Sequence, residues 1–157
     1  MKKTNAMREL DKAKIKYEAI EYKVDEEYLG AIHVASQTGN DITKVFKTLA
    51  LTGEKDELII ACIPGSDELN LKKIATLACI KKVEMLELKK LLEKTGYVRG
   101  GCSPIGIKKK HRSFIHESCI EKDFIFISAG LKGLQIKLNP KDLIEFLNMT
   151  VSNIIIE

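Results

Sequence analysis

Apolar residues recur three or four positions apart in several segments of the chain, which is the pattern of an amphipathic helix. Such segments run from Thr4 to Lys14, from Gly30 to Thr38, from Asn70 to Ala78 and from Glu87 to Thr95. A last helix is expected to begin at Asn139-Pro140, because asparagine caps exposed N–H groups and proline suits the first helical position. The pattern therefore predicts short helices distributed along the whole chain.

Other segments carry β-branched and aromatic residues at short spacing, which favours strands. They are Tyr17 to Val24, Lys44 to Thr52, Leu58 to Ile63, Phe124 to Ser128 and Leu134 to Leu138. The second and third are separated by a turn and predict a hairpin, as do the last two. Because the strands come in consecutive pairs, strict alternation of strand and helix fails. We expect an α+β fold with a mixed, mainly antiparallel sheet, curled toward a barrel, and helices packed around it.

Composition narrows the class of protein further. The chain has 157 residues, of which 45% are hydrophobic and 31% charged, so it has material for a core and for a charged surface. This length suits one domain, here taken as residues 1–157. No apolar run is long enough to cross a bilayer, and no apolar stretch follows Met1-Lys2-Lys3 as a signal peptide requires. We expect a cytoplasmic protein that does not bind membranes.

The four cysteines lie far apart in the sequence and form no C-x-x-C pair. They are Cys62, Cys79, Cys102 and Cys119. Structural zinc sites need closely spaced ligands, and a disulfide framework is typical of small secreted domains. We therefore predict reduced thiols, no metal and no cofactor.

Lys47 is expected to share one face of its strand with Val45, Leu49 and Leu51, since side chains alternate along a strand. An ammonium group among apolar neighbours is costly to bury without a partner. Lys47 is therefore either a cation at the wall of a pocket, placed to hold a phosphate, carbonyl or hydroxyl oxygen, or a lysine that reaches out to water.

The segment from Gly96 to Gly106 contains four glycines within eleven residues. Such a backbone can turn sharply and approach a ligand, and its N–H groups can stabilise the negative charge that forms when an ester is attacked. No phosphate-binding or dinucleotide-binding glycine motif is present. The alternative is a purely structural loop. Ser128-Ala129-Gly130 ends a strand and could add a hydroxyl and N–H donors to the same pocket, or form only a hairpin turn.

Cys102 could serve as a nucleophile with His111 or His116 as its base, although the sequence places neither imidazole beside it. The competing interpretation is a small side chain that packs beneath the loop. Ser103 lacks the G-x-S-x-G context of an activated serine. A nucleophilic side chain is thus weakly supported.

No acidic residue lies between Glu93 and Glu117, whereas the same window holds six cations. These are Lys94, Arg99, Lys108, Lys109, Lys110 and Arg112. Such a cluster can bind the phosphates of a nucleic acid, or it can be a solvated loop.

Together these stretches resemble the YbaK/EbsC family, the free-standing aminoacyl-tRNA deacylases related to the editing domain of bacterial prolyl-tRNA synthetases. The resemblance covers almost the whole chain. It rests on Thr4-Asn5-Ala6, Tyr17 to Tyr22, Val45 to Leu49, Leu71-Lys72-Lys73, Thr95-Gly96-Tyr97, Gly100 to Gly106 with Lys108-Lys109, and Ser128-Ala129-Gly130 before Gly133-Leu134.

The resemblance implies roles for individual residues. Lys47 matches the lysine that family members require for activity. The substrate-binding positions it implies are Tyr22, Gly100, Gly101, Ser103, Pro104, Ser128, Gly130 and Gln135. Arg99, Lys108, Lys109 and Lys110 would contact the tRNA backbone. Gln135 departs from the family, because relatives commonly carry an aspartate there, and a neutral amide cannot pair with a cation.

The resemblance therefore predicts trans-editing of Cys-tRNA(Pro), in which the substrate's own thiol attacks its ester carbonyl and releases a thiolactone. Orientation and oxyanion stabilisation can supply most of the rate, because an aminoacyl ester is already activated. Two alternatives stay open: hydrolysis of Ala or another small amino acid from tRNA, and a non-catalytic module that binds tRNA or a nucleotide. The expected partners are aminoacyl-tRNA and prolyl-tRNA synthetase.

Overall fold

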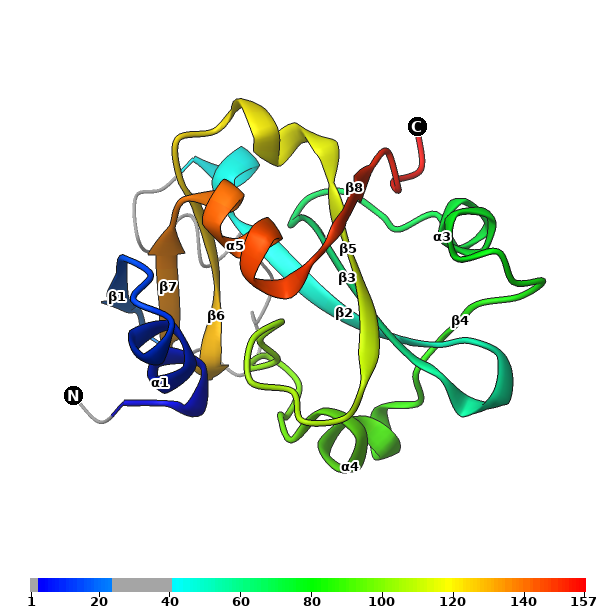
Figure 1. Ribbon diagram of the computed structural model, residues 1–157, viewed down its shortest axis with the longest axis horizontal. Coiled ribbons are helices and arrows are strands. Elements are labelled where there is room, and N and C mark those ends of the chain that lie inside the picture. The colour runs from blue at the N-terminus through cyan, green and yellow to red at the C-terminus, as the bar shows by residue number, and fades with distance from the viewer. Residues whose placement is uncertain (1–2, 24–40) are drawn as a thin grey trace.

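The computed structural model describes residues 3–23 and 41–157 of the chain, and within them two sheets carry four helices (Figure 1). The first sheet has the strand order β1-β7-β6, with β1 at Tyr17–Glu21, β7 at Leu134–Leu138 and β6 at Ile125–Leu131. The second has the order β4-β2-β3-β5-β8. Its strands are β2 at Phe46–Thr52, β3 at Leu58–Pro64, β4 at Glu84–Met85, β5 at His111–His116 and β8 at Thr150–Ser152.

The pairing confirms a mixed, mainly antiparallel α+β fold. Antiparallel pairs join β1 to β7, β6 to β7, β2 to β3 and β2 to β4, whereas β3–β5 and β5–β8 are parallel. A bridge between Val45 and Phe126 connects the two sheets. The strands described do not close into a barrel, so the curl is partial.

Both predicted hairpins are confirmed. In β2 and β3 the paired residues run from Phe46 and Pro64 to Thr52 and Leu58, with the turn at Glu54–Asp56 between them. In β6 and β7, Ile125 pairs with Leu138, and an irregularity between Ser128 and Leu131 bends the strand before the turn. This bend lies at the predicted Ser128-Ala129-Gly130 segment.

The helices are α1 at Asn5–Lys12, α3 at Leu71–Ala78, α4 at Leu91–Thr95 and α5 at Pro140–Leu147. Their caps agree with the sequence: the side chains of Thr4, Asn70 and Asn139 accept hydrogen bonds from the N–H groups of Met7, Lys73 and Lys141. The helix predicted from Glu87 is shorter, because residues Leu88–Lys90 form a 3₁₀ turn. The helix predicted over Gly30 to Thr38 lies outside the described residues.

The two largest apolar clusters of the described residues hold most of these elements together. The larger lies between the sheets and combines α1, α5 and the inner faces of β6 and β7 with Phe46, Cys62 and Ile115 of the second sheet. The smaller packs α3 against the opposite face of the second sheet, around Leu51, Ile63 and Phe114. Figure 1 shows α1 beside the first sheet and α3 on the far side of the second. The faces of β2 thus meet different environments.

Candidate functional site

Several predicted site residues fall on one face of the first sheet and the adjoining part of β2. Gln135 of β7 pairs with Ile20 of β1 on one side and with Ser128 of β6 on the other. The parallel bridge between Val45 and Phe126 sets the position of β2. Lys47 and Ser128 each lie two residues beyond that bridge, so they occupy corresponding positions and the same face.

Lys47 occupies an apolar part of this face. It is half-buried and pairs across the hairpin with Ile63, while Val45 and Leu51 on its own face are 2% and 0% exposed. Among the described residues, no hydrogen bond or ion pair reaches the Lys47 ammonium group. A half-buried cation that has no protein partner there is suited to bind an oxygen atom of a ligand.

Of the three polar side chains on this face, Lys47, Ser128 and Gln135, that of Gln135 is the most deeply buried, with 5% of its surface exposed. Its side-chain oxygen Oε1 has no hydrogen-bond donor in residues 3–23 and 41–157. A buried acceptor left without a donor costs about 1–3 kcal/mol. A donor on a bound substrate, such as an ammonium or hydroxyl group, would satisfy it.

The glycine-rich loop folds around Tyr97. The Tyr97 hydroxyl donates to the carbonyl oxygen of Ile105 at 2.5 Å, and the ring is 8% exposed. A Cβ atom at Gly106 would come within 2.7 Å of the Tyr97 hydroxyl, and one at Gly130 within 2.7 Å of the ring. Both glycines have positive φ, at 86° and 102°. Sequence reasoning missed this role of Tyr97, although its place among the glycines was a signal.

The loop also lies directly against the turn between β6 and β7. A Cβ atom at Gly101 would meet the backbone nitrogen of Lys132 at 3.1 Å and the carbonyl carbon of Leu131 at 3.2 Å. Gly100, just before it, has a φ of 86°. The two glycine-containing segments that were predicted to share one pocket are therefore in contact.

The remaining predicted substrate-binding residues differ in exposure. Ser103 is fully buried, and its hydroxyl accepts a hydrogen bond from the N–H of Ile105 at 3.2 Å, while Pro104 is also buried. Ser128 is half-buried, and its hydroxyl accepts from the N–H of Gly130 at 3.1 Å. Tyr22 is half-buried, and its N–H donates to the carbonyl of Gly133 at 2.9 Å. The two serines therefore hold the backbone of their loops in shape.

Cys102 has the environment of a packed thiol. Burial raises the pKa of Cys102 to about 11, although a hydrogen bond with Thr95 opposes the shift. The ring nitrogen Nδ1 of His111 lies 2.8 Å from the carbonyl of Lys109, and that of His116 lies 2.9 Å from the Ser118 hydroxyl. Neither contact involves Cys102, and the thiolate needed for attack is disfavoured at neutral pH.

The predicted tRNA-binding cations, Arg99, Lys108, Lys109 and Lys110, are exposed. In the fold, two acidic residues from outside the basic window between Glu93 and Glu117 lie against its cations. Asp56 pairs with Lys94 and lies 3.9 Å from Lys109, and Glu57 holds Arg112 through two hydrogen bonds of 2.6 and 2.8 Å. The pKa of Asp56 is lowered, mainly by its hydrogen bond with Lys94. Fewer cations are therefore available to a ligand than the six counted in the sequence.

No group of three His, Cys, Asp or Glu side chains gathers within the described ranges. No helix of those ranges is long and apolar enough to span a membrane.

Residues 26–146 match the family model of the aminoacyl-tRNA editing domain. The chain belongs to this family. Its members act on aminoacyl-tRNA, so the chain is an aminoacyl-tRNA deacylase by family. The resemblance seen in the sequence is thereby confirmed.

Two relatives by sequence support this membership. A protein of Enterococcus faecalis, named provisionally as the Cys-tRNA(Pro)/Cys-tRNA(Cys) deacylase EbsC, is 44% identical over 93% of this chain and 89% of its own length. A proline–tRNA ligase of Brachyspira hyodysenteriae is 30% identical over 69% of this chain, which corresponds to 20% of that enzyme.

Solved structures agree in fold. The hypothetical protein APE2540 superposes with a TM-score of 0.89 at 17% identity, covering 98% of this chain and 100% of its own. A structure described, again provisionally, as a trans-editing enzyme for prolyl-tRNA synthetase has a TM-score of 0.83 at 18% identity, covering 98% and 96%. The α+β architecture of this editing-domain family is therefore shown for the chain.

Proposed function

We propose that this protein clears cysteine from mischarged Cys-tRNA(Pro) in the cytoplasm, with Lys47 and the glycine-rich loop as its catalytic centre. The observation that carries the proposal is the placement of Lys47. It lies on the same face as Ser128 and Gln135, with no partner for its ammonium group among the described residues. The name of the Enterococcus relative supports the choice of substrate.

The proposed reaction needs no nucleophile from the protein. The thiol sulfur of the cysteinyl group attacks its own ester carbonyl, and a carbon–sulfur bond forms. The carbon–oxygen bond to the terminal ribose then breaks, and the thiol proton goes to the departing ribose oxygen. The products are cysteine thiolactone and free tRNA. The raised pKa of Cys102 agrees with this route, because the one thiol within the glycine-rich loop is held protonated.

Each residue of the site has a part in this proposal. The Lys47 ammonium holds the terminal adenosine or the carbonyl oxygen. Backbone N–H groups between Gly100 and Gly106 donate to the oxyanion, an effect that contributes about 3–4 kcal/mol per donor in other acyl-transfer enzymes. Oε1 of Gln135 accepts from the α-ammonium group of the amino acid. The exposed cations Arg99, Lys108, Lys109 and Lys110 meet the acceptor stem.

Prolyl-tRNA synthetase is the proposed partner. Support comes from the match to part of a proline–tRNA ligase and from the structural neighbour described as its trans-editing enzyme. The synthetase would deliver mischarged tRNA(Pro), so that the editing domain itself need not recognise the anticodon.

The test is release of labelled amino acid from Cys-tRNA(Pro) and Ala-tRNA(Pro) by the wild type, Lys47→Ala and Lys82→Ala. Lys82 is an exposed lysine next to β4, paired with Glu84, and serves as the charge-matched control. We expect the wild type and Lys82→Ala to release thiolactone from Cys-tRNA(Pro) and Lys47→Ala to be inactive. Release of intact alanine instead would indicate hydrolysis, and tRNA binding without turnover would indicate a binding module.

A further inference from the structure

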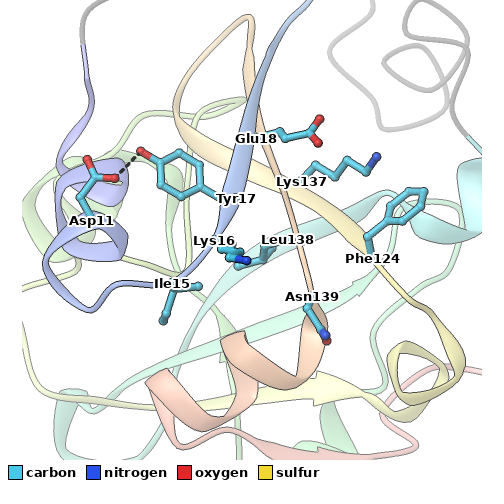
Figure 2. Close-up of a pocket in the computed structure, with 9 residues that line it drawn as sticks. All are labelled: Asp11, Ile15, Lys16, Tyr17, Glu18, Phe124, Lys137, Leu138 and Asn139. Atoms are coloured by element: carbon cyan, nitrogen blue, oxygen red, sulfur yellow. Dashed lines mark hydrogen bonds between the residues drawn. The ribbon is translucent and has the colours of Figure 1, made fainter.

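A groove of about 660 Å³ lies at the end of the first sheet that is opposite to the glycine-rich loop (Figure 2). It is formed where β1 and β6 begin and where β7 ends. Its lining residues are Asp11, Ile15, Lys16, Tyr17, Glu18, Phe124, Lys137, Leu138 and Asn139. Nothing in the proposed reaction uses this groove.

Glu18 and Lys137 of the groove lie on the same sheet face as the candidate site, whereas Tyr17 and Leu138 face the larger core on the other side. Lys137 pairs with Glu18 on β1 and with Phe126 on β6. Gln135 lies two residues away along β7, which places it on the same face at a distance of about 7 Å. A ligand that extends from Gln135 toward the start of β1 would therefore enter the groove.

One cation of the groove, Lys137, is held in place without being neutralised. Its ammonium lies 4.1 Å from the centre of the Phe124 ring. The Lys44 ammonium, outside the groove lining, lies 4.0 Å from the same centre and pairs with Asp123 at 3.5 Å. Figure 2 shows Lys137 extending between Glu18 and Phe124. In the described part of the chain, no carboxylate lies within ion-pair distance of Lys137 or Lys16. The Lys137 ammonium, fixed in this way, is available to an anion.

The acids of the groove differ in their availability. The Asp11 carboxylate is engaged by the Lys3 ammonium at 2.5 Å and by the Tyr17 hydroxyl at 3.0 Å. The lowered pKa of Asp11 reflects mainly the hydrogen bond from Lys3. Glu18 is exposed and faces Lys137 across the strand pair. It is the groove carboxylate that an incoming anion would meet.

We propose that this groove binds the phosphodiester backbone of the single-stranded 3′ end of tRNA, immediately before the terminal adenosine. The inference rests on the proposed function, because the reacting end of that strand would lie against Lys47, Ser128 and Gln135. Proteins that bind single strands combine a cationic groove with aromatic side chains, and this groove contains Lys16, Lys137 and Phe124 in that arrangement. The chain would therefore hold the duplex and the single strand at two separate surfaces.

The experiment measures binding of a labelled single-stranded RNA that ends in CCA, by fluorescence anisotropy at several salt concentrations. Lys16→Ala and Lys137→Ala should each weaken binding by about fivefold and reduce the salt slope by about 0.7. Glu18→Gln should strengthen binding, because it removes the carboxylate beside Lys137. Lys82→Ala and Glu145→Gln make the same charge changes at exposed positions outside the groove and should leave the affinity unchanged.

Unchanged affinity in both lysine variants, or equal affinities of Glu18→Gln and Glu145→Gln, would overturn the inference. Displacement of the RNA by polyglutamate at matched charge concentration would also overturn it in favour of an acidic protein partner. A folding defect cannot imitate the gain expected from Glu18→Gln. The RNA carries no amino acid, so its binding is measured apart from deacylation. Groove-dependent binding by a protein that does not deacylate Cys-tRNA(Pro) would contradict only the proposed function. Deacylation by a protein whose RNA binding does not depend on the groove would contradict only this inference.

Discussion

The hydroxyl of Tyr97 donates to the carbonyl oxygen of Ile105 at 2.5 Å, and the same side chain leaves space only for glycine at positions 106 and 130. This contact joins the two ends of the glycine-rich loop. It also fixes the loop against the bend in β6. The shape of the proposed oxyanion site thus depends on a buried aromatic side chain that makes no contact with substrate in the proposal.

Gly106→Ala should therefore lower the unfolding free energy more than Gly96→Ala does, although the two glycines have similar backbone conformations. Its Cβ would lie 2.7 Å from the Tyr97 hydroxyl at a φ of 86°, whereas at Gly96, with a φ of 81°, nothing lies within 4 Å. We expect Gly96→Ala to cost about 1 kcal/mol and Gly106→Ala about 2–3 kcal/mol of unfolding free energy. Chemical denaturation measures both.

A double variant separates the clash from the backbone strain. Tyr97→Phe removes the hydroxyl that the new methyl group would meet, so it should recover part of the stability and activity lost in Gly106→Ala. Equal losses in Gly96→Ala and Gly106→Ala, or no recovery in the double variant, would show that Tyr97 does not shape the loop.

Gln135→Met should raise stability while it lowers activity. The substitution keeps the side-chain length and removes a buried oxygen that has no donor among the described residues. We expect the unfolding free energy to rise by about 1 kcal/mol and deacylation of Cys-tRNA(Pro) to fall at least tenfold. Thermal melts and initial rates measure the two effects. A variant that is both less stable and fully active would exclude Gln135 from the substrate site.

The sequence was sufficient to predict the hairpins, the helix caps and the apolar face around Lys47, because each depends on residues close together in the chain. It did not predict β5, whose residues His111-Arg112-Ser113-Phe114-Ile115-His116 are largely polar although the strand lies between β3 and β8. Ser113 is nevertheless buried. Such a strand is defined by its neighbours, so its own alternation carries little signal.

The candidate site, too, could be predicted from the sequence only in part. The sequence indicated Lys47 and the two glycine-containing loops, and the fold places the loops in contact. It could not predict that Asp56 and Glu57 come beside the basic window, since they lie about forty residues or more from most of its cations. Charge counted along the chain misses pairs that only the tertiary structure brings together.

Cys102→Ser should leave deacylation nearly unchanged. Burial raises the pKa of Cys102 to about 11, so the side chain is a thiol at neutral pH and is not the nucleophile in the proposed reaction. We expect a rate within about twofold of the wild type, and alkylation of exposed Cys79 before Cys102. Loss of activity in a folded Cys102→Ser protein would restore the nucleophile interpretation.

Stability should fall at alkaline pH. Burial is the main cause that raises the pKa of Cys62 and Tyr97 to about 12 and of Cys119 to about 11. The unfolded chain loses these protons first, so their stabilising contribution is full below about pH 9 and disappears as the pH rises toward 12. Cys62→Ser keeps a partner for Thr48 but does not titrate. Its melting temperature should therefore fall less steeply than that of the wild type between about pH 8 and about pH 10.5.

Asp56→Asn should strengthen tRNA binding, because it releases two cations of the basic window. Asp56 pairs with Lys94 and lies 3.9 Å from Lys109, and its left-handed backbone, with a φ of 61°, is one that asparagine tolerates. The matched control is Asp142→Asn at another exposed aspartate. We expect a tighter dissociation constant for a duplex acceptor stem and a steeper salt dependence in Asp56→Asn alone. If both variants bind the stem equally, the window contributes no phosphate contacts near Asp56, and Lys109 is a solvated lysine.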